Sequence, residues 1–201
     1  SGIKKEKLNG SNLAIIYSFG IIFPKNYIDN YKFGMWNVHP GDLPKYRGRH
    51  PITWAFLKNE KKIFVTIHKI DEKIDRGKLL IKTFVKRTFS DDILSVEKKI
   101  LKKLPKLIPS ALKKIKSKNL LKIKKGNYFP PLYNGVKIKD PKNHDHLYIY
   151  NAVKSQAIFG GVKVGKSIFT KAMFYSKKNK IKNKKSFLVV CKNNKKLILI
   201  K

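Results

Sequence analysis

The chain has 201 residues, of which 42% are hydrophobic, and a formal net charge of +35 at pH 7. This length fits one domain with a small extension, and no apolar run approaches the ~20 residues that span a bilayer. No charged-then-apolar leader opens the chain, so we expect a cytoplasmic protein without membrane contact. The charge favours an anionic partner, but only four of the 47 basic residues are arginine, which indicates a lysine-rich solvated surface more than a nucleic-acid reader.

The first half of the chain alternates strand patterns with helix patterns. Strands are expected over residues 13–17, 33–38, 61–70 and 79–85. Helices are expected over residues 24–31, 50–60 and 91–116. The last of these begins with a capping signal at Asp91 and Asp92. Pro105 and Pro109 interrupt it, so we expect a kinked pair of helices there.

The second half begins with a loop rich in aromatic residues, proline and glycine, over residues 118–135. A helix is expected over residues 145–156, and residues 186–191 and 197–200 are expected to pair as a hairpin. The lysines and asparagines of residues 176–185 predict a mobile surface loop. The single cysteine, Cys191, excludes an internal disulfide and a multi-cysteine zinc site, and its apolar neighbours predict a buried thiol.

The stretch from Gly34 to Pro51 carries the strongest functional signal. Its strand leads into His39, and Asn37 lies two residues earlier, so both side chains point to one face and can address one small group. Proline and glycine are dense in the residues that follow, which predicts a loop and excludes a helix. The residues alone therefore indicate a polar site at the end of a strand in an α/β domain.

This stretch resembles the folate-dependent formyltransferase family, whose pattern is roughly N-x-H-x-x-x-L-P-x-Y-R-G followed by a helix. Asn37, His39 and the run from Leu43 to Gly48 match that pattern. A second family block, roughly G-V-T-I-H-x-M-D-E-x-x-D-x-G, is similar to F-V-T-I-H-K-I-D-E-K-I-D-R-G from Phe64 to Gly77. Two blocks in the right order make a specific signal.

The resemblance implies a Rossmann-like formyltransferase core with a mostly parallel sheet in residues 1–118, and a smaller β-rich C-terminal region in residues 119–201. It also implies formyl-tetrahydrofolate as the formyl donor and no metal. Family members carry several strands and helices before the segment that corresponds to Leu13, and twelve residues precede it here. We therefore expect the front of the catalytic domain to be missing, which would affect activity.

The resemblance further implies which residues act in catalysis. Formyl transfer passes through a tetrahedral intermediate whose oxygen carries negative charge. Asn37 and a protonated His39 are expected to donate hydrogen bonds to that oxygen, and Asp75 is expected to keep His39 charged. His68, on the strand itself, is expected to be structural or to support the site from behind.

Binding residues follow from the same resemblance. Contacts to the folate donor are expected from Phe19, Gly20, Ile21, Ile22, Pro24, Ile70, Asp71 and Glu72. Contacts to the acceptor are expected from Tyr46, Arg47, Gly48, Arg49 and His50.

The continuation R-G-R-H-P after Tyr46 resembles sugar N-formyltransferases more than the R-G-A-A-P-I that is typical of the tRNA enzymes. We therefore expect the acceptor to be a nucleotide-linked amino sugar destined for surface polysaccharide. Methionyl-tRNA formyl transfer is the alternative, which the charge keeps open. A further alternative is a non-catalytic folate or nucleotide binder, or an assembly such as a homodimer that pairs through an exposed sheet edge.

Overall fold

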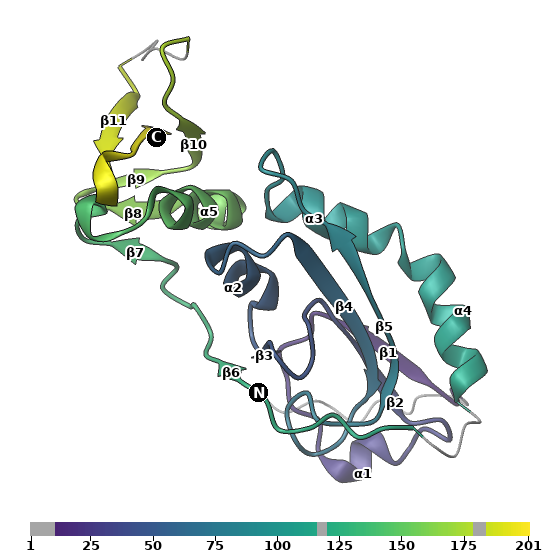
Figure 1. The fold of residues 1–201 in the computed structure, drawn as a ribbon. Helices are drawn as coiled ribbons and strands as arrows, with labels where there is room; N and C mark the ends of the chain where they lie inside the picture. Colours follow the sequence, from purple (N-terminus) through teal and green to yellow (C-terminus); the bar gives the residue numbers. More distant parts are fainter. Residues whose placement is uncertain (1–10, 116–119, 179–183) are drawn as a thin grey trace.

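The computed structural model describes residues 11–115, 120–178 and 184–201 (Figure 1). Its first half is built on a four-stranded sheet in the order β1 (Ala14–Tyr17), β2 (Met35–His39), β4 (Lys62–Lys69) and β5 (Leu79–Lys86). The first two strands are parallel, whereas the β2–β4 and β4–β5 pairs are antiparallel. The α/β class is confirmed, but this sheet is mixed and not mostly parallel. A parallel pair needs a crossover of a dozen residues or more, and the loop from β4 to β5 is shorter than that.

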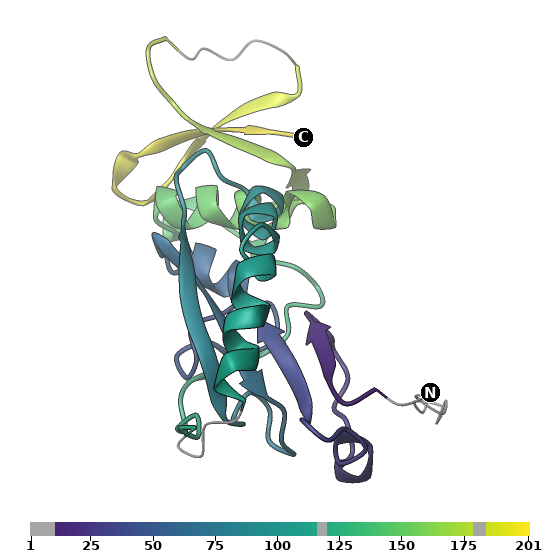
Figure 2. The same cartoon turned by 90° about the vertical axis from the view of Figure 1, so that its right-hand side faces the viewer.

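The two faces of the sheet differ in character. Ile63, Val65 and Ile67 alternate along β4 and are buried, as predicted. They belong to a core that also contains buried residues of α3 (Ile93–Leu101) and α4 (Leu104–Lys114), the predicted helix pair. Figure 2 shows these two helices lying across β4 and β5. Because strand residues alternate, the side chains between the core positions of β2 and β4 point to the opposite face, where the site lies.

Shorter elements border that second face. Pro24 precedes the four-residue helix α1 (Lys25–Ile28), and α2 (Pro51–Leu57) follows the motif loop. Within that loop, β3 (Arg47–Gly48) pairs in parallel with β6 (Tyr128–Phe129). The aromatic segment after residue 120 is therefore hydrogen-bonded to the motif loop, although the two are some eighty positions apart in the chain.

The C-terminal region is rich in strands and packs on α5 (His146–Gln156), which lies against α2. One sheet has the order β7 (Lys137–Ile138), β8 (Val162–Val164) and β9 (Ser167–Phe169). The other has the order β10 (Lys171–Phe174), β12 (Lys196–Ile200) and β11 (Ser186–Val190). The β11–β12 hairpin confirms the prediction. Three single-turn helices complete the region: η1 (Pro141–Asn143), η2 (Ala157–Phe159) and η3 (Lys192–Asn194).

The core of the four-stranded sheet and the core around α5 meet at α2. Trp54 packs against both the core of the four-stranded sheet and the core around α5. Cys191 is buried in the second core, where burial raises its thiol pKa to about 11. The predicted boundary at residue 118 falls in a segment outside the described ranges and stays a prediction, as does the mobility of residues 176–185, of which 179–183 also lie outside those ranges. Among the described residues, no helix is long and apolar enough to cross a membrane.

Candidate active site

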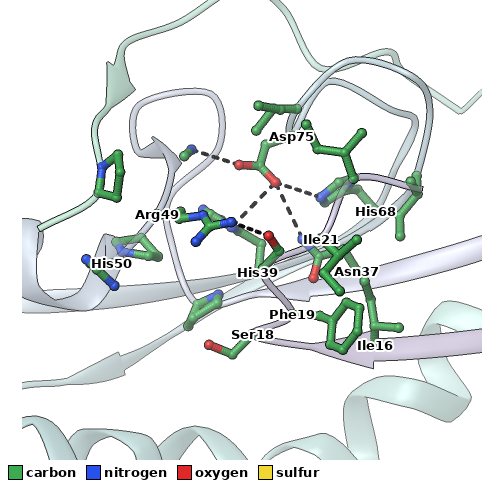
Figure 3. A pocket seen from close by; sticks show the side chains of 18 of the residues that line it. Ile16, Ser18, Phe19, Ile21, Asn37, His39, Arg49, His50, His68 and Asp75 are labelled. Atoms are coloured by element: carbon green, nitrogen blue, oxygen red, sulfur yellow. Dashed lines mark hydrogen bonds and ion pairs between the residues drawn. The ribbon is translucent and has the colours of Figure 1, made fainter. Parts of the chain in front are cut away.

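A cavity of about 680 Å³ opens beside the ends of β1 and β2, where Asn37 and His39 lie, and Glu97 of α3 also lines it. Its size is within the range of pockets that bind drug-sized ligands. The loop after β1, the motif loop, the loop from β4 to β5, the aromatic segment and η2 all contribute to its walls. Figure 3 shows that the polar side chains meet at one side of this cavity, around Asp75.

Asp75 is buried and is approached by hydrogen-bond donors and histidine nitrogens from three directions. Its Oδ2 accepts the Gly48 backbone N–H at 2.8 Å, and its Oδ1 lies 3.4 Å from Asn37 Nδ2. Nitrogens of His39 and His68 each lie 3.6 Å from the same Oδ1. Burial alone would raise the pKa of this carboxyl, but the contacts with His68, His39 and Gly48 together lower it. Asp75 is therefore an anion at neutral pH.

The two strands place these groups in register. Asn37 and His68 are paired neighbours on β2 and β4, and His39 is paired with Thr66. The register of β4 against β5 shifts between Ile67 and His68, a bulge of the kind that redirects a side chain. Asp75 itself has a positive φ of 53°, a conformation that non-glycine residues rarely adopt, so its loop holds the carboxylate against its local preference.

His39 differs from its prediction in charge. Burial lowers its pKa, and the opposing effects of Asp75 and of the Tyr46 carbonyl do not overcome that. The ring is therefore neutral at pH 7 and not held as an imidazolium. Its Nε2 lies 2.7 Å from the Tyr46 carbonyl oxygen, which only accepts hydrogen bonds, so Nε2 carries the hydrogen. The Nδ1 atom is left without one, and at 3.6 Å from Asp75 it makes no hydrogen bond to it.

The predicted donor contacts lie mainly along one wall of the cavity. This wall contains Phe19, Gly20, Ile21, Ile22, Ile70, Asp71 and Glu72. Pro24 does not line the cavity, because it serves as the residue before α1, and the buried Phe23 takes its place. Arg49 crosses towards this wall and donates a hydrogen bond to the Gly20 carbonyl, so the motif loop and the loop after β1 are joined at the cavity entrance.

The predicted acceptor contacts divide into two groups. Gly48, Arg49 and His50 line the cavity, but Tyr46 and Arg47 do not. The Tyr46 ring is buried, stacks on Phe129, and donates its hydroxyl hydrogen to Glu60 at 2.8 Å.

Arg47 is occupied by the protein itself. Its guanidinium donates to the Ile74 carbonyl at 2.7 and 3.1 Å and to the Gly126 carbonyl at 3.4 Å. Tyr46 and Arg47, which both belong to the family pattern, therefore support the loops around the site and do not line the cavity.

Residues of the second half complete the cavity, and the predicted acceptor and donor sets do not contain them. They are Tyr128, Pro131, Tyr133, Ile158 and Phe159. Tyr133 is 71% exposed and lies under the Arg49 guanidinium, 5.5 Å from ring centroid to Cζ. The aromatic and proline content of residues 118–135 was the sequence signal that could have indicated Tyr128, Pro131 and Tyr133. No sequence pattern indicated the residues of η2. Within the described ranges, no group of three or more His, Cys, Asp or Glu residues is arranged to hold a metal ion.

A family model for formyl transferases matches residues 3–112, more than half of the chain. The chain belongs to the formyl transferase family. Among its curated relatives, the methionyl-tRNA formyltransferase of Caldicellulosiruptor saccharolyticus is 30% identical over 169 residues, which are 82% of this chain and 51% of that protein. This chain thus spans about half the length of that relative.

Solved structures share the formyl transferase fold. A variant of HypX from Aquifex aeolicus superposes with a TM-score of 0.73 at 16% identity, covering 94% of this chain and 36% of that one. An N-formyltransferase from Helicobacter canadensis, in complex with folinic acid and dTDP-3-aminofucose, superposes with a TM-score of 0.69 at 19% identity, covering 90% of this chain and 71% of that one. At these identities the likeness concerns the fold alone.

Proposed function

We propose that this chain transfers a formyl group from formyl-tetrahydrofolate to the amine of a nucleotide-linked amino sugar. The observation that carries the proposal is the meeting of Asn37, His39 and Asp75 at one side of a cavity of about 680 Å³, in a chain of the formyl transferase family. The three residues come from two separate sequence blocks, and the fold brings them within 3.6 Å of one another through Asp75.

The walls of the cavity fit a folate-like donor. Phe19, Ile21 and Ile22 are about half exposed, so they offer apolar surface to a flat ring system. Asp71 and Glu72 lie on the same wall and can accept hydrogen bonds from amine and amide groups of a pterin. When bound there, the donor would supply the formyl carbon.

The polar residues have separate tasks in the proposed reaction. The acceptor amine forms a bond to the formyl carbon, the formyl oxygen becomes negatively charged, and the bond from that carbon to the donor nitrogen then breaks. Asn37 donates an N–H to the charged oxygen, an interaction worth about 3–4 kcal/mol for one donor in other enzymes. Asp75 accepts the proton that the amine loses, and the departing donor nitrogen takes up a proton. His39 becomes a second donor to the oxygen only when it is protonated, so in the free protein Asn37 is the donor already in place.

Two observations favour a nucleotide-linked sugar as the acceptor. Arg49 and the exposed ring of Tyr133 lie together at the cavity wall, a combination that suits a phosphate beside a ring. The Helicobacter canadensis enzyme was solved with dTDP-3-aminofucose, and the formyltransferase PseJ of Anoxybacillus kamchatkensis with a UDP-linked formamido sugar. The names of the curated relatives favour a second candidate, formyl transfer to initiator methionyl-tRNA, with which a net charge of +35 is compatible.

A transfer assay with formyl-tetrahydrofolate, a panel of dTDP- and UDP-linked amino sugars and aminoacylated initiator tRNA tests the proposal. We expect turnover with a nucleotide sugar, and we expect Asn37→Ala to lower kcat by roughly 10²–10³. Asn30→Ala, an exposed turn residue after α1, is the matched control and should leave kcat unchanged. Turnover with tRNA alone, with affinity that falls steeply as salt increases, would favour the second candidate. Absence of turnover with every acceptor would leave a folate or nucleotide binder as the function. A cytoplasmic location and a homodimer stay predictions, the second of which sedimentation analysis would test.

A further inference from the structure

His50, the residue that precedes α2, joins the motif loop to the aromatic segment. Its backbone has a positive φ of 55°, which non-glycine residues rarely adopt. Its side chain makes no capping hydrogen bond to α2. Instead, its Nδ1 accepts the backbone N–H of Leu132 at 2.9 Å, across 82 positions of the chain. The strained backbone thus places the ring where it holds a distant part of the cavity wall.

Trp54 holds the same segment one helical turn further along. The His50 carbonyl accepts the Trp54 backbone N–H at 3.1 Å, and Trp54 Nε1 donates to the Pro130 carbonyl at 3.1 Å. Both neighbours of Leu132 in the chain line the cavity. The position of this part of the wall therefore depends on two side chains from the start of α2, and His50 is the one that itself lines the cavity.

The bond to Leu132 determines where the hydrogen of the His50 ring lies. A backbone N–H only donates, so Nδ1 presents a lone pair and Nε2 carries the hydrogen of the neutral ring. Partial burial and the neighbouring Arg49 lower the pKa of His50, so the ring is neutral at pH 7. In the part of the chain that the structure describes, no group accepts a hydrogen bond from Nε2. His50 is thus a neutral donor that is fixed in one tautomer beside the cavity.

Arg49 lies next to this donor at the cavity wall (Figure 3). Its guanidinium lies over the Tyr133 ring, 5.5 Å from Cζ to the ring centroid, and the His50 ring meets the same ring edge-on, with centroids 6.4 Å apart. Arg49 donates one hydrogen bond to the Gly20 carbonyl, and a guanidinium with five N–H groups has others left. A neutral donor beside a cation suits an oxygen that only accepts and carries negative charge, as in a phosphate.

We propose that His50 is a specificity-determining residue whose Nε2–H donates to a phosphate oxygen of the nucleotide-linked acceptor, while Arg49 supplies the positive charge. The inference rests on the proposed function for the identity of the acceptor, and it assigns the phosphate to the corner between Arg49, His50 and Tyr133. A ring held through Nδ1 can donate at Nε2 but cannot accept there, so a ligand group that only donates gains no bond. The corner therefore discriminates diphosphate-linked sugars from free amino sugars.

Calorimetric titration of the 201-residue protein with dTDP and with UDP tests the phosphate contact without any turnover. His50→Asn keeps an oxygen near the position of Nδ1 for the Leu132 N–H, but it has no donor that reaches the position of Nε2, and asparagine tolerates a positive φ. We expect this variant to bind dTDP roughly 10- to 100-fold more weakly than the wild type, since a hydrogen bond to a charged group is lost.

His50→Gln exchanges the two functions of the ring. Its amide nitrogen reaches the position of Nε2, whereas no acceptor remains for the Leu132 N–H, so this variant should bind dTDP more tightly than His50→Asn. Hydrogen exchange of the Leu132 amide should be slow in the wild type and in His50→Asn, and faster in His50→Gln. Neither substitution changes the net charge at pH 7, so nonspecific attraction of dTDP to a chain of charge +35 is the same in all three proteins.

His144→Asn is the matched control, because that ring is stacked on Tyr148 and does not line the cavity, and it should bind dTDP as the wild type does. Equal affinity of His50→Asn and the wild type for dTDP would overturn the inference, as would equally weak binding by both His50 variants. Weaker binding of folinic acid alone would also overturn it, because the corner would then hold a carboxylate of the formyl donor.

This binding test and the formyl transfer assay fail separately. Absence of turnover, in a protein that binds dTDP through His50, would refute the proposed function and leave the phosphate contact intact. Turnover with tRNA alone, in a protein that binds neither dTDP nor UDP, would refute the phosphate contact and leave formyl transfer intact.

Discussion

Asp75→Asn separates the charge of this side chain from its place in the loop. The amide oxygen of the new side chain can still accept the Gly48 N–H, which Asp75 Oδ2 accepts at 2.8 Å. The amide nitrogen then replaces Oδ1, with a nitrogen of His39 and one of His68 each 3.6 Å away. We therefore expect the fold to be retained, with a stability loss of about 1 kcal/mol from exchanging a charged acceptor for a neutral one.

Activity should respond far more strongly than stability. Without the carboxylate no group at this position accepts the amine proton, and loss of such a group lowers rates by roughly 10²–10⁴. This range corresponds to about 3–5 kcal/mol of activation free energy, since each factor of ten is 1.36 kcal/mol. The assay is kcat for formyl transfer beside urea denaturation of the same samples, with Asp140→Asn, which caps η1, as the matched control. A variant Asp75→Asn whose kcat stays within threefold of the wild type would refute the proton-accepting role.

The Asp75 charge also predicts how stability depends on pH. Its pKa is lowered in the folded protein relative to the usual ~3.9, so the anion contributes stability at higher pH. That contribution is lost as the pH falls below about 4 towards the folded pKa. Wild type and Asp75→Asn should therefore differ in acid-induced unfolding below this pH, and parallel acid limbs would contradict the lowered pKa.

Four further outcomes follow from buried groups. The lowered pKa of His39 means that stability falls as pH drops below about 6.5, and His39→Gln should flatten this slope in pH-dependent urea titrations. Arg87→Leu removes three hydrogen bonds of 2.7–2.9 Å from a buried guanidinium and leaves two asparagine oxygens without it, so unfolding free energy should drop by roughly 3 kcal/mol or more. A Cβ on Gly77 would lie 1.7 Å from the Lys69 carbonyl oxygen, so Gly77→Ala should lower the melting temperature markedly, and an unchanged value would contradict the loop geometry. Cys191 should resist thiol reagents in the native protein and react on denaturation.

The meeting of Asn37, His39 and Asp75 was predictable because the patterns that indicate it are local in the sequence. Asn37 and His39 share a strand face by the two-residue period, and Asp75 belongs to a block whose loop is closed by Gly77. The structure brings the three together as expected. The charge of His39 was not predictable, because the carboxylate that favours protonation was visible in the sequence while the burial that opposes it was not.

Two residues that were predicted to contact the acceptor, Tyr46 and Arg47, do not line the cavity, and long-range contacts are the reason. Tyr46 turns from the cavity because its ring stacks on Phe129, and Arg47 is held by carbonyls of residues 74 and 126. No period or spacing near the motif contains that information. The mixed direction of the strands was not predicted for a similar reason. Apolar runs indicate that strands are buried, but they do not indicate whether neighbouring strands are parallel or antiparallel.

The pairing of β3 with β6 connects the aromatic segment that lines the cavity to the loop that carries Asp75. Gly48 of β3 donates to Asp75, and Arg47 beside it bonds the carbonyls of Ile74 and Gly126. A ligand that contacts Tyr128 would therefore touch a segment that is hydrogen-bonded, through β3, to the Asp75 carboxylate. Linkage between two binding sites is reciprocal. If the bound acceptor raises the affinity for the donor by some factor, the bound donor raises the affinity for the acceptor by the same factor. Binding of one of the two proposed substrates would then strengthen binding of the other.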